Sequence, residues 1–278
     1  PSGGGSSTLA GLSDCTVSSV NPGTDTNPGG GLGHIWVNTA TGFIWVCTDA
    51  TTNLNEWENV GGGSGTIYLD AWFGSRGVVA GGYSSGSAQI NNIDYFIINN
   101  PSNASDFGNM TETRAQTGAA SDGSRGVFAG GSSKNKIDYV TISTPGNATN
   151  FGTLSVSMST TGFSNGSRGV FAGGSYNRTV WVTIASTSNS YGAHTLTQQR
   201  SWSGGCNDQT RGVVAGGYYY SVGYMNIIDY FTTASMSNGT DFGDLSVSRS
   251  GIGGTSDTTR GVFVGGNSNT IDYITIAT

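Results

Sequence analysis

One seven-residue motif occurs five times in this chain of 278 residues, and its spacing constrains the fold more than any other feature. Each copy begins with Arg-Gly-Val and ends with Gly-Gly, and the copies start at Arg76, Arg125, Arg168, Arg211 and Arg260. Successive arginines lie 49, 43, 43 and 49 residues apart. A period in this range indicates one supersecondary unit repeated along the chain. The fold is therefore expected to follow from the structure of a single repeat.

Each repeat is predicted to contain four short β-strands. In the second copy, residues 117–121 and 125–129 form two strands joined by the Asp-Gly pair at 122–123, which favours a tight hairpin. Residues 137–142 alternate apolar and polar side chains, as a half-buried strand does. An aromatic residue, Phe151, opens the fourth strand. The other copies keep this order, so the sequence predicts an all-β domain.

Composition supports strands and excludes two classes of partner. Glycine is abundant at 47 residues, only 10% of residues are charged, and the net charge is −6 without a basic stripe. Nucleic acid is therefore not an expected partner. No apolar run is long enough to span a membrane as a helix, so no membrane association is expected.

The repeat resembles the Kelch repeat of β-propellers. The shared features are a glycine pair that closes the second strand, an aromatic residue in the third, and an aromatic residue that opens the fourth. The chain departs from the usual pattern at the last position, where Phe107, Phe151 and Phe242 stand in place of tryptophan. The resemblance implies that each repeat is one blade of a propeller.

The fifth copy ends after its third strand, and the N-terminal region contains a candidate for the missing strand. Residues 55–60 align with the fourth strand at 240–245, so they are predicted to pair with residues 271–276 and to close a five-bladed ring. The expected domains are therefore an attachment segment over 1–54 and a Kelch-like propeller over 55–278. A rival interpretation makes the hairpin at 35–46 part of a sixth blade.

The N-terminal segment is similar to bacteriophage tail-fibre modules. The similarity is carried by residues 8–19, Thr-Leu-Ala-Gly-Leu-Ser-Asp-Cys-Thr-Val-Ser-Ser, and by the stretch from Gly33 to Trp57. The Arg-Gly-Val-Phe-Ala-Gly-Gly copies look like those in structural proteins of aquatic phages. The resemblance implies a virion protein made in the host cytoplasm. Residues 1–54 would then bind other virion proteins or further copies of the chain, with a trimer favoured because phage fibres are usually trimers.

The function that this resemblance implies is non-covalent binding by a propeller displayed on a tail fibre, spike or capsid appendage. The ligand would be a host-surface glycan or a virion partner. Two alternatives stay open: a purely architectural capsid decoration or tail connector protein, and a bacterial surface adhesin. The chain begins at Pro1 without a signal peptide, which favours the virion over the adhesin.

Candidate binding residues lie in two long inserts between the glycine pair and the third strand. Copies one and four have ten residues there, against four or five in the other copies. Tyrosine combines a flat apolar ring with a hydroxyl and loses little entropy when it is ordered. The candidates are Tyr218, Tyr219, Tyr220 and Tyr224 of copy four, with Tyr83 of copy one on the same face. The alternative is that these tyrosines pack against each other or against a neighbouring subunit.

No catalytic constellation is recognisable, so no enzymatic activity, cofactor or metal is expected. The only histidines, His34 and His194, occupy unrelated positions. Cys15, Cys47 and Cys206 are expected to be reduced, with a Cys15–Cys47 disulfide as the alternative. The repeat arginines are expected to bind backbone carbonyls or an acid, rather than to line an anion-binding channel. The candidate acids are the aspartates of the Ile-Asp-Tyr motif at Asp94, Asp138, Asp229 and Asp272.

Overall fold

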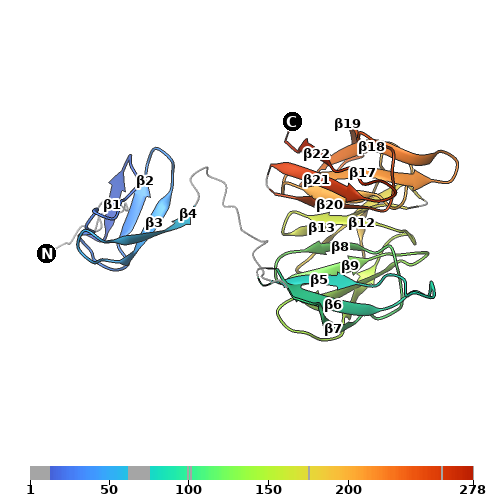
Figure 1. Cartoon of the computed structure of the whole chain (residues 1–278), viewed down its shortest axis with the longest axis horizontal. Helices are drawn as coiled ribbons and strands as arrows, with labels where there is room; N and C mark the ends of the chain where they lie inside the picture. Colours follow the sequence, from blue (N-terminus) through green and yellow to red (C-terminus); the bar gives the residue numbers. More distant parts are fainter. Residues whose placement is uncertain are drawn as a thin grey trace. The chain divides into compact units, whose positions relative to one another are not determined.

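A computed structural model of the chain is all-β in the residues that it describes, which are 13–61, 76–98, 100, 102–174, 176–257 and 259–277 (Figure 1). These residues contain 22 strands in six small sheets and no helix. The chain divides into two compact units, residues 1–70 and residues 71–278. The all-β prediction is confirmed.

The N-terminal unit contains one four-stranded sheet. Its strands are β1 (Cys15–Ser18), β2 (Ile35–Asn38), β3 (Ile44–Asp49) and β4 (Glu56–Gly61), in that order across the sheet. The predicted hairpin is confirmed as the antiparallel pair β2–β3, whereas β1 runs parallel to β2. The prediction that residues 55–60 pair with residues 271–276 is wrong, because β4 pairs with β3. The hydrogen bonds of β4 therefore complete the N-terminal sheet.

Each copy of the repeat forms its own antiparallel sheet, with strands in sequence order across it. Sheet one contains β5 (Arg76–Ala80), β6 (Asn92–Ile97) and β7 (Ser105–Asn109). Sheet two contains β8 (Gly118–Ser121), β9 (Arg125–Ala129), β10 (Lys136–Thr141) and β11 (Thr149–Thr153). Sheet three contains β12 (Thr161–Ser164), β13 (Arg168–Gly173), β14 (Arg178–Thr183) and β15 (Tyr191–His194). Sheet four contains β16 (Gly204–Asn207), β17 (Arg211–Tyr219), β18 (Gly223–Thr232) and β19 (Thr240–Asp244). Sheet five contains β20 (Ile252–Ser256), β21 (Arg260–Gly265) and β22 (Asp272–Thr275).

The turn between the first and second strands is stabilised in the same way in four sheets. One side-chain oxygen of the turn accepts backbone N–H groups from the second and third residues after it, the third being the repeat arginine. This Asx arrangement explains why the turns use Asp122, Asn165, Asp208 and Asp257. At Asp257 the N–H groups of Arg260 and Thr259 lower the pKa of the carboxyl group. The predicted hairpins are confirmed.

The glycine pair after the second strand has a backbone conformation that favours glycine. All ten glycines of the five pairs have positive φ, where a side chain is strained. The second glycine donates its N–H to a carbonyl of the linker that leads to the next sheet, as Gly131 does to Met158 at 2.9 Å and Gly217 to Arg249 at 2.8 Å. A Cβ atom on Gly130 would clash with the Met158 carbonyl. The first four pairs therefore hold the following linker in place.

Consecutive sheets pack face to face through buried apolar side chains. Separate hydrophobic clusters join sheet one to two, two to three, three to four, and four to five. The first strands β8, β12, β16 and β20 also touch, so closely that a Cβ on Gly162 or Gly254 would clash with the backbone of the preceding sheet. Among the described residues, no hydrophobic cluster joins sheet five to sheet one.

The repeat arginines tie each sheet to the next. In all five copies the guanidinium lies over the aromatic ring of the third strand of its own sheet, 3.9 to 4.6 Å from the ring centroid. Four of them also donate to a carbonyl just after the third strand of the next sheet, for example Arg125 to Ile184 at 2.9 Å and Arg211 to Ile276 at 2.8 Å. The expectation of carbonyl partners is confirmed.

Three of the four aspartates of the Ile-Asp-Tyr motif, Asp138, Asp229 and Asp272, pair with a different set of arginines, which lie in the linkers. Arg114 meets Asp138 at 2.6 Å, Arg200 meets Asp229 at 3.0 Å, and Arg249 meets Asp272 at 2.7 Å. The first two pairs are completely buried, and burial lowers the pKa of Arg114 and Arg200 against the opposing effect of the carboxylates. The expectation that the motif aspartates pair with the repeat arginines is therefore wrong for Asp138, Asp229 and Asp272.

Sheet three replaces both members of this ion pair with apolar residues. Val180 lies opposite Phe171 as Asp138 lies opposite Phe128, so Val180 occupies the aspartate position and Trp181 the tyrosine position. Met158 takes the arginine position, since its carbonyl accepts the same glycine N–H. Met158 and Val180 belong to one hydrophobic cluster. The fold thus tolerates either a buried ion pair or a buried apolar pair, but it keeps the two residues matched.

This matching predicts the outcome of a double substitution in sheet four. We expect Arg200→Met alone to lower the free energy of unfolding by about 3–5 kcal/mol, because Asp229 stays buried without its cation. Adding Asp229→Val should recover most of the loss, as in sheet three. The measurement is urea unfolding, with Lys134→Met in the more exposed Lys134–Glu112 pair as the control. A loss for Arg200→Met no larger than that of the control would contradict the assigned role.

Candidate binding site

The insert of copy four forms a hairpin and not a loop. Its residues lengthen β17 and β18 beyond the matching strands of the other sheets, to nine and ten residues. Tyr218 pairs with Tyr224 and Tyr219 with Gly223 across the ladder. The ten residues of this insert have enough β-forming side chains to continue both strands. The candidate tyrosines are therefore held on regular backbone.

Aromatic rings gather on this hairpin and on the linker beside it. Trp202 stacks on Tyr218 with ring centroids 5.6 Å apart and planes 20° apart, and Tyr218 contacts Tyr224 at 5.4 Å. We call Trp202, Tyr218 and Tyr224 the aromatic cluster. Nearer the turn, Tyr219 and Tyr220 form a second pair at 4.5 Å, and the hydrogen bond between their hydroxyls raises the pKa of Tyr219.

Much of this aromatic surface stays open to solvent. Tyr220 is 79% exposed, Tyr224 51% and Trp202 44%. The predicted packing of the tyrosines against each other is therefore present, and it leaves ring faces available to a ligand. An exposed group of large aromatic residues is unusual on a monomer and is typical of binding surfaces.

The fifth candidate, Tyr83, lies apart from this cluster. Its backbone bridges to Gln89 within the insert of copy one, and its hydroxyl lies 3.2 Å from the hydroxyl of Ser132 in sheet two. In Figure 1 this insert and the β17–β18 hairpin extend to the same side of their sheets. No ring contact within the described part of the chain joins Tyr83 to the tyrosines of copy four. The structure therefore does not gather the two inserts into one site.

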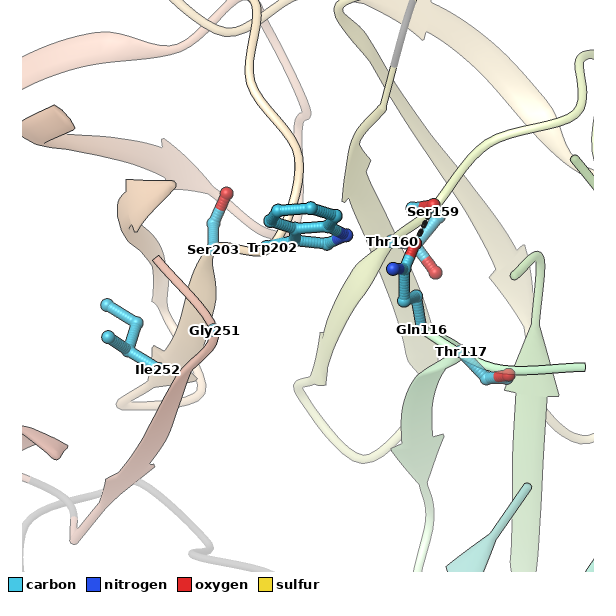
Figure 2. Close-up of a pocket in the computed structure, with 8 residues that line it drawn as sticks. All are labelled: Gln116, Thr117, Ser159, Thr160, Trp202, Ser203, Gly251 and Ile252. Carbon is cyan, nitrogen blue, oxygen red and sulfur yellow. Dashed lines mark hydrogen bonds between the residues drawn. The ribbon is translucent and has the colours of Figure 1, made fainter. Parts of the chain in front are cut away.

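A pocket of about 320 Å³ opens beside the aromatic cluster (Figure 2). It lies at the start of the first strands of sheets two to five, and each of these sheets contributes the same two positions. The lining residues are Gln116 and Thr117, Ser159 and Thr160, Trp202 and Ser203, and Gly251 and Ile252. Trp202 belongs both to this pocket and to the aromatic cluster, so the two features form one continuous site.

The backbone at the first of these positions is left-handed in three sheets. The φ angles are 60° at Gln116, 61° at Trp202 and 67° at Gly251. Residues other than glycine adopt this conformation rarely and at an energetic cost, and such strain tends to occur at functional sites. Sequence reasoning missed Gln116 and Trp202. The available signal was the change of side chain at one repeat position, which only a strand-by-strand alignment makes visible.

Hydrogen bonds define the polar side of the pocket. The hydroxyl of Ser159 donates to Oε1 of Gln116 at 2.7 Å, which leaves the amide NH₂ of Gln116 as a donor toward the pocket. The hydroxyl of Thr160 is already engaged with Ala129 and Gly118. None of the lining residues is ionisable. The pocket can therefore stack a ring and donate hydrogen bonds, without supplying charge.

The remaining chemically reactive side chains take structural positions. Within the described ranges, all three cysteines are free and buried, so the Cys15–Cys47 disulfide is not formed. Burial raises the pKa of Cys206 to about 12. His34 is buried, with Nδ1 accepting the N–H of Gly30 and Nε2 2.8 Å from the Thr16 hydroxyl. No group of three or more metal-ligating side chains occurs in the described residues. They also contain no helix of the length and apolarity that a membrane span needs.

The chain was compared with protein families and with curated proteins. No protein-family model matches the chain, and no curated protein matches it. The similarities to Kelch repeats and to phage fibre modules therefore rest on the motifs described above.

Proposed function

We propose that the chain is a structural protein of a bacteriophage virion that binds a host-surface glycan non-covalently through the aromatic cluster. The observation that carries the proposal is the stacked group of Trp202, Tyr218 and Tyr224 beside a pocket, in which Trp202 and Tyr224 are exposed. Rings of this kind offer a flat apolar face and a polar edge, which suits the alternating surface of a sugar ring. The virion assignment is supported by the phage-like motifs alone.

Binding requires a scaffold, and we propose that sheets one to five are the blades of a closed five-bladed Kelch-like propeller. The two end sheets have complementary uncovered faces. Val79 and Phe96 of sheet one are exposed, although their counterparts Phe128 and Val140 in sheet two are buried. Val264 and Ile271 of sheet five are also exposed, whereas their counterparts in the middle sheets are buried. The two faces are the unmatched halves of an interface that occurs four times within the chain.

The repeat arginines support the same closure. Arg260 lies over Tyr273 as the other four lie over their rings. By position in the repeat, the carbonyl that would accept its N–H is that of Ile98, which matches Ile142 and Ile184 in the next two sheets. Docking of sheet five on sheet one would then complete a fifth arginine contact and bury both exposed faces.

The N-terminal sheet is proposed to attach the propeller to the virion, as part of a homotrimer. All four clusters of buried hydrophobic residues in the described chain belong to the second unit. In the N-terminal sheet, the loop before β2 covers the tryptophan side, where Nε1 of Trp36 donates to the Val20 carbonyl. The aliphatic residues of the opposite face are half-buried or exposed, namely Val17, Ile35, Val37, Ile44 and Val46. Burying this face against another layer would stabilise the sheet.

An architectural role is the second candidate, and the aliphatic face of the N-terminal sheet is the observation that favours it. In that case the aromatic cluster would contact a neighbouring virion protein and not a glycan. Adsorption measurements separate the two candidates.

The first test replaces three tyrosines of the hairpin. We expect Tyr219→Ser, Tyr220→Ser and Tyr224→Ser together to preserve the circular dichroism spectrum and to weaken adsorption of particles to host cells by at least about tenfold, since each lost ring removes a contact of roughly 0.5–1.5 kcal/mol. Tyr176→Ser on sheet three, a tyrosine of similar exposure, is the matched control. Adsorption equal to that of the parent would exclude the hairpin as the receptor site.

The second test concerns attachment. We expect Val37→Lys in the full-length chain to convert a trimer into a monomer, because a lysine in the middle of an aliphatic interface would be buried without a partner. The measurement is light scattering coupled to size-exclusion chromatography. Leu54→Lys, which changes an exposed residue outside the strands, should leave the trimer intact. A Val37→Lys chain that assembles like the parent would show that this face is not the interface.

The third test asks whether the ring is closed. If sheet five docks on sheet one, Val79→Lys places a charge in an interface and should lower the free energy of unfolding by more than about 2 kcal/mol. If the face is free, the change should stay within roughly 0.5 kcal/mol, as for a surface residue. Val247→Lys, at another exposed valine, provides the comparison in the same urea titration. Equal effects of the two substitutions would argue against closure.

A further inference from the structure

We propose that the pocket between Trp202 and Gln116 binds a single uncharged sugar ring and sets the specificity of the site. This inference rests on the proposed glycan-binding function and extends it from the hairpin surface to a defined subsite. It names a ligand class, a neutral hexose or N-acetylhexosamine, and two residues, neither of which belongs to the tyrosine insert.

The first argument comes from the repeat itself. The repeat arginine and the glycine pair are the same in all five copies, because the contacts between sheets require them. At the mouth of the pocket, one position differs in every sheet that contributes to it, and its residues are Gln116, Ser159, Trp202 and Gly251. The side chain there ranges from none to the largest of the twenty. A position that the scaffold leaves free in this way is available for a ligand.

The second argument is that Trp202 is held ready for stacking. One face of its indole lies on Tyr218, which in turn contacts Tyr224. Its backbone is left-handed and its side chain lines the pocket, and Figure 2 shows the indole nitrogen turned toward Gln116 and Ser159. A ring that is fixed before binding loses little entropy when a ligand arrives. The strained backbone at Trp202 therefore has a functional explanation.

The third argument concerns hydrogen bonds and charge. The hydroxyl of Ser159 fixes the orientation of the Gln116 amide, so the NH₂ group of Gln116 and the indole N–H of Trp202 face the pocket as two donors. Sugar hydroxyl, ring and acetamido oxygens accept such hydrogen bonds. A sialic acid, phosphate or sulfate group would have no cation in the lining to neutralise it, and burying it there would be costly. The chemistry of the lining favours an uncharged ligand.

The size of the pocket agrees with one ring. Its volume of about 320 Å³ lies at the lower end of the range for small-molecule sites, which is roughly 300–1,000 Å³. Such a space suits one terminal sugar of a glycan. The remaining sugars of the chain would extend over Tyr224 and Tyr220, which are exposed on the adjoining hairpin. The pocket would thus recognise the terminal residue while the hairpin contributes contact area.

The experiment measures binding of glucose, galactose, mannose and N-acetylglucosamine to the full-length protein by saturation-transfer NMR and calorimetry. We expect at least one of the four sugars to bind. For that sugar, Trp202→Ala should weaken binding by about tenfold or more, and Gln116→Ala by roughly three- to tenfold, as expected for one lost stacking contact and one lost hydrogen bond. Trp202→Phe keeps a ring to stack on Tyr218 but removes the indole donor, so it should give an intermediate loss.

Tyr176→Ala is the control for the loss of an exposed aromatic residue, and circular dichroism checks the folding of each variant. The proposal is overturned if none of the four sugars binds, or if a bound sugar is insensitive to both Trp202→Ala and Gln116→Ala. These outcomes are distinct from failure of the proposed function. Loss of adsorption in the tyrosine variant without a Trp202-dependent sugar would leave the hairpin as the receptor site and remove the pocket. Normal adsorption in every variant would remove both.

Discussion

The structure of the repeat domain depends on one composite interaction, the arginine that stacks on its own sheet and donates to the next. The aromatic ring holds the guanidinium in place, and the acceptor is a backbone carbonyl, so the contact survives changes in the neighbouring side chains. Arg168 illustrates this, because its ring is Trp181 where the other copies have tyrosine. The glycine pair adds a second contact, because the N–H of its second glycine donates to a carbonyl of the linker that leads to the next sheet. Together these contacts fix the relation of each sheet to its successor, and hydrophobic clusters fill the space between them.

The sequence predicted the parts of this fold that are local or periodic. The Asx turns at Asp122 and Asp257, the alternating third strands and the hairpin at β2–β3 all follow from side chains near one another in the chain. The pairing of β4 could not be predicted in this way. Its residues suit either sheet, and the choice of β3 depends on contacts between segments that share no local signal. The linker arginines were missed for the same reason, since Arg200 and Asp229 are matched only in three dimensions.

The candidate site shows a similar division. The tyrosines of copy four could be predicted from the sequence because the insert contains more of them than packing within a sheet requires. In the structure, Tyr218 and Tyr224 belong to the aromatic cluster. Trp202 and Gln116 precede their strands by only a few residues and look like ordinary linker residues when each repeat is considered alone. The register of the strands shows that Trp202 and Gln116 occupy the same position in their repeats and that both line the same pocket. Periodicity in the sequence reveals the residues that the repeats share. A structure is needed to see that residues which differ between the repeats lie close together.

The convergence of four variable positions on one opening has a consequence for how such a protein can change. Gln116, Ser159, Trp202 and Gly251 belong to four different repeats, yet none of them takes part in the arginine contacts or the glycine pairs that hold the sheets together. Recombination or unequal duplication of repeats would therefore replace one lining residue of the opening at a time, while the arginine contacts and the glycine pairs between sheets stay unchanged. Shuffling whole repeats would change the lining of the opening without altering the contacts between sheets, and a protein engineer could make the same change with four codons.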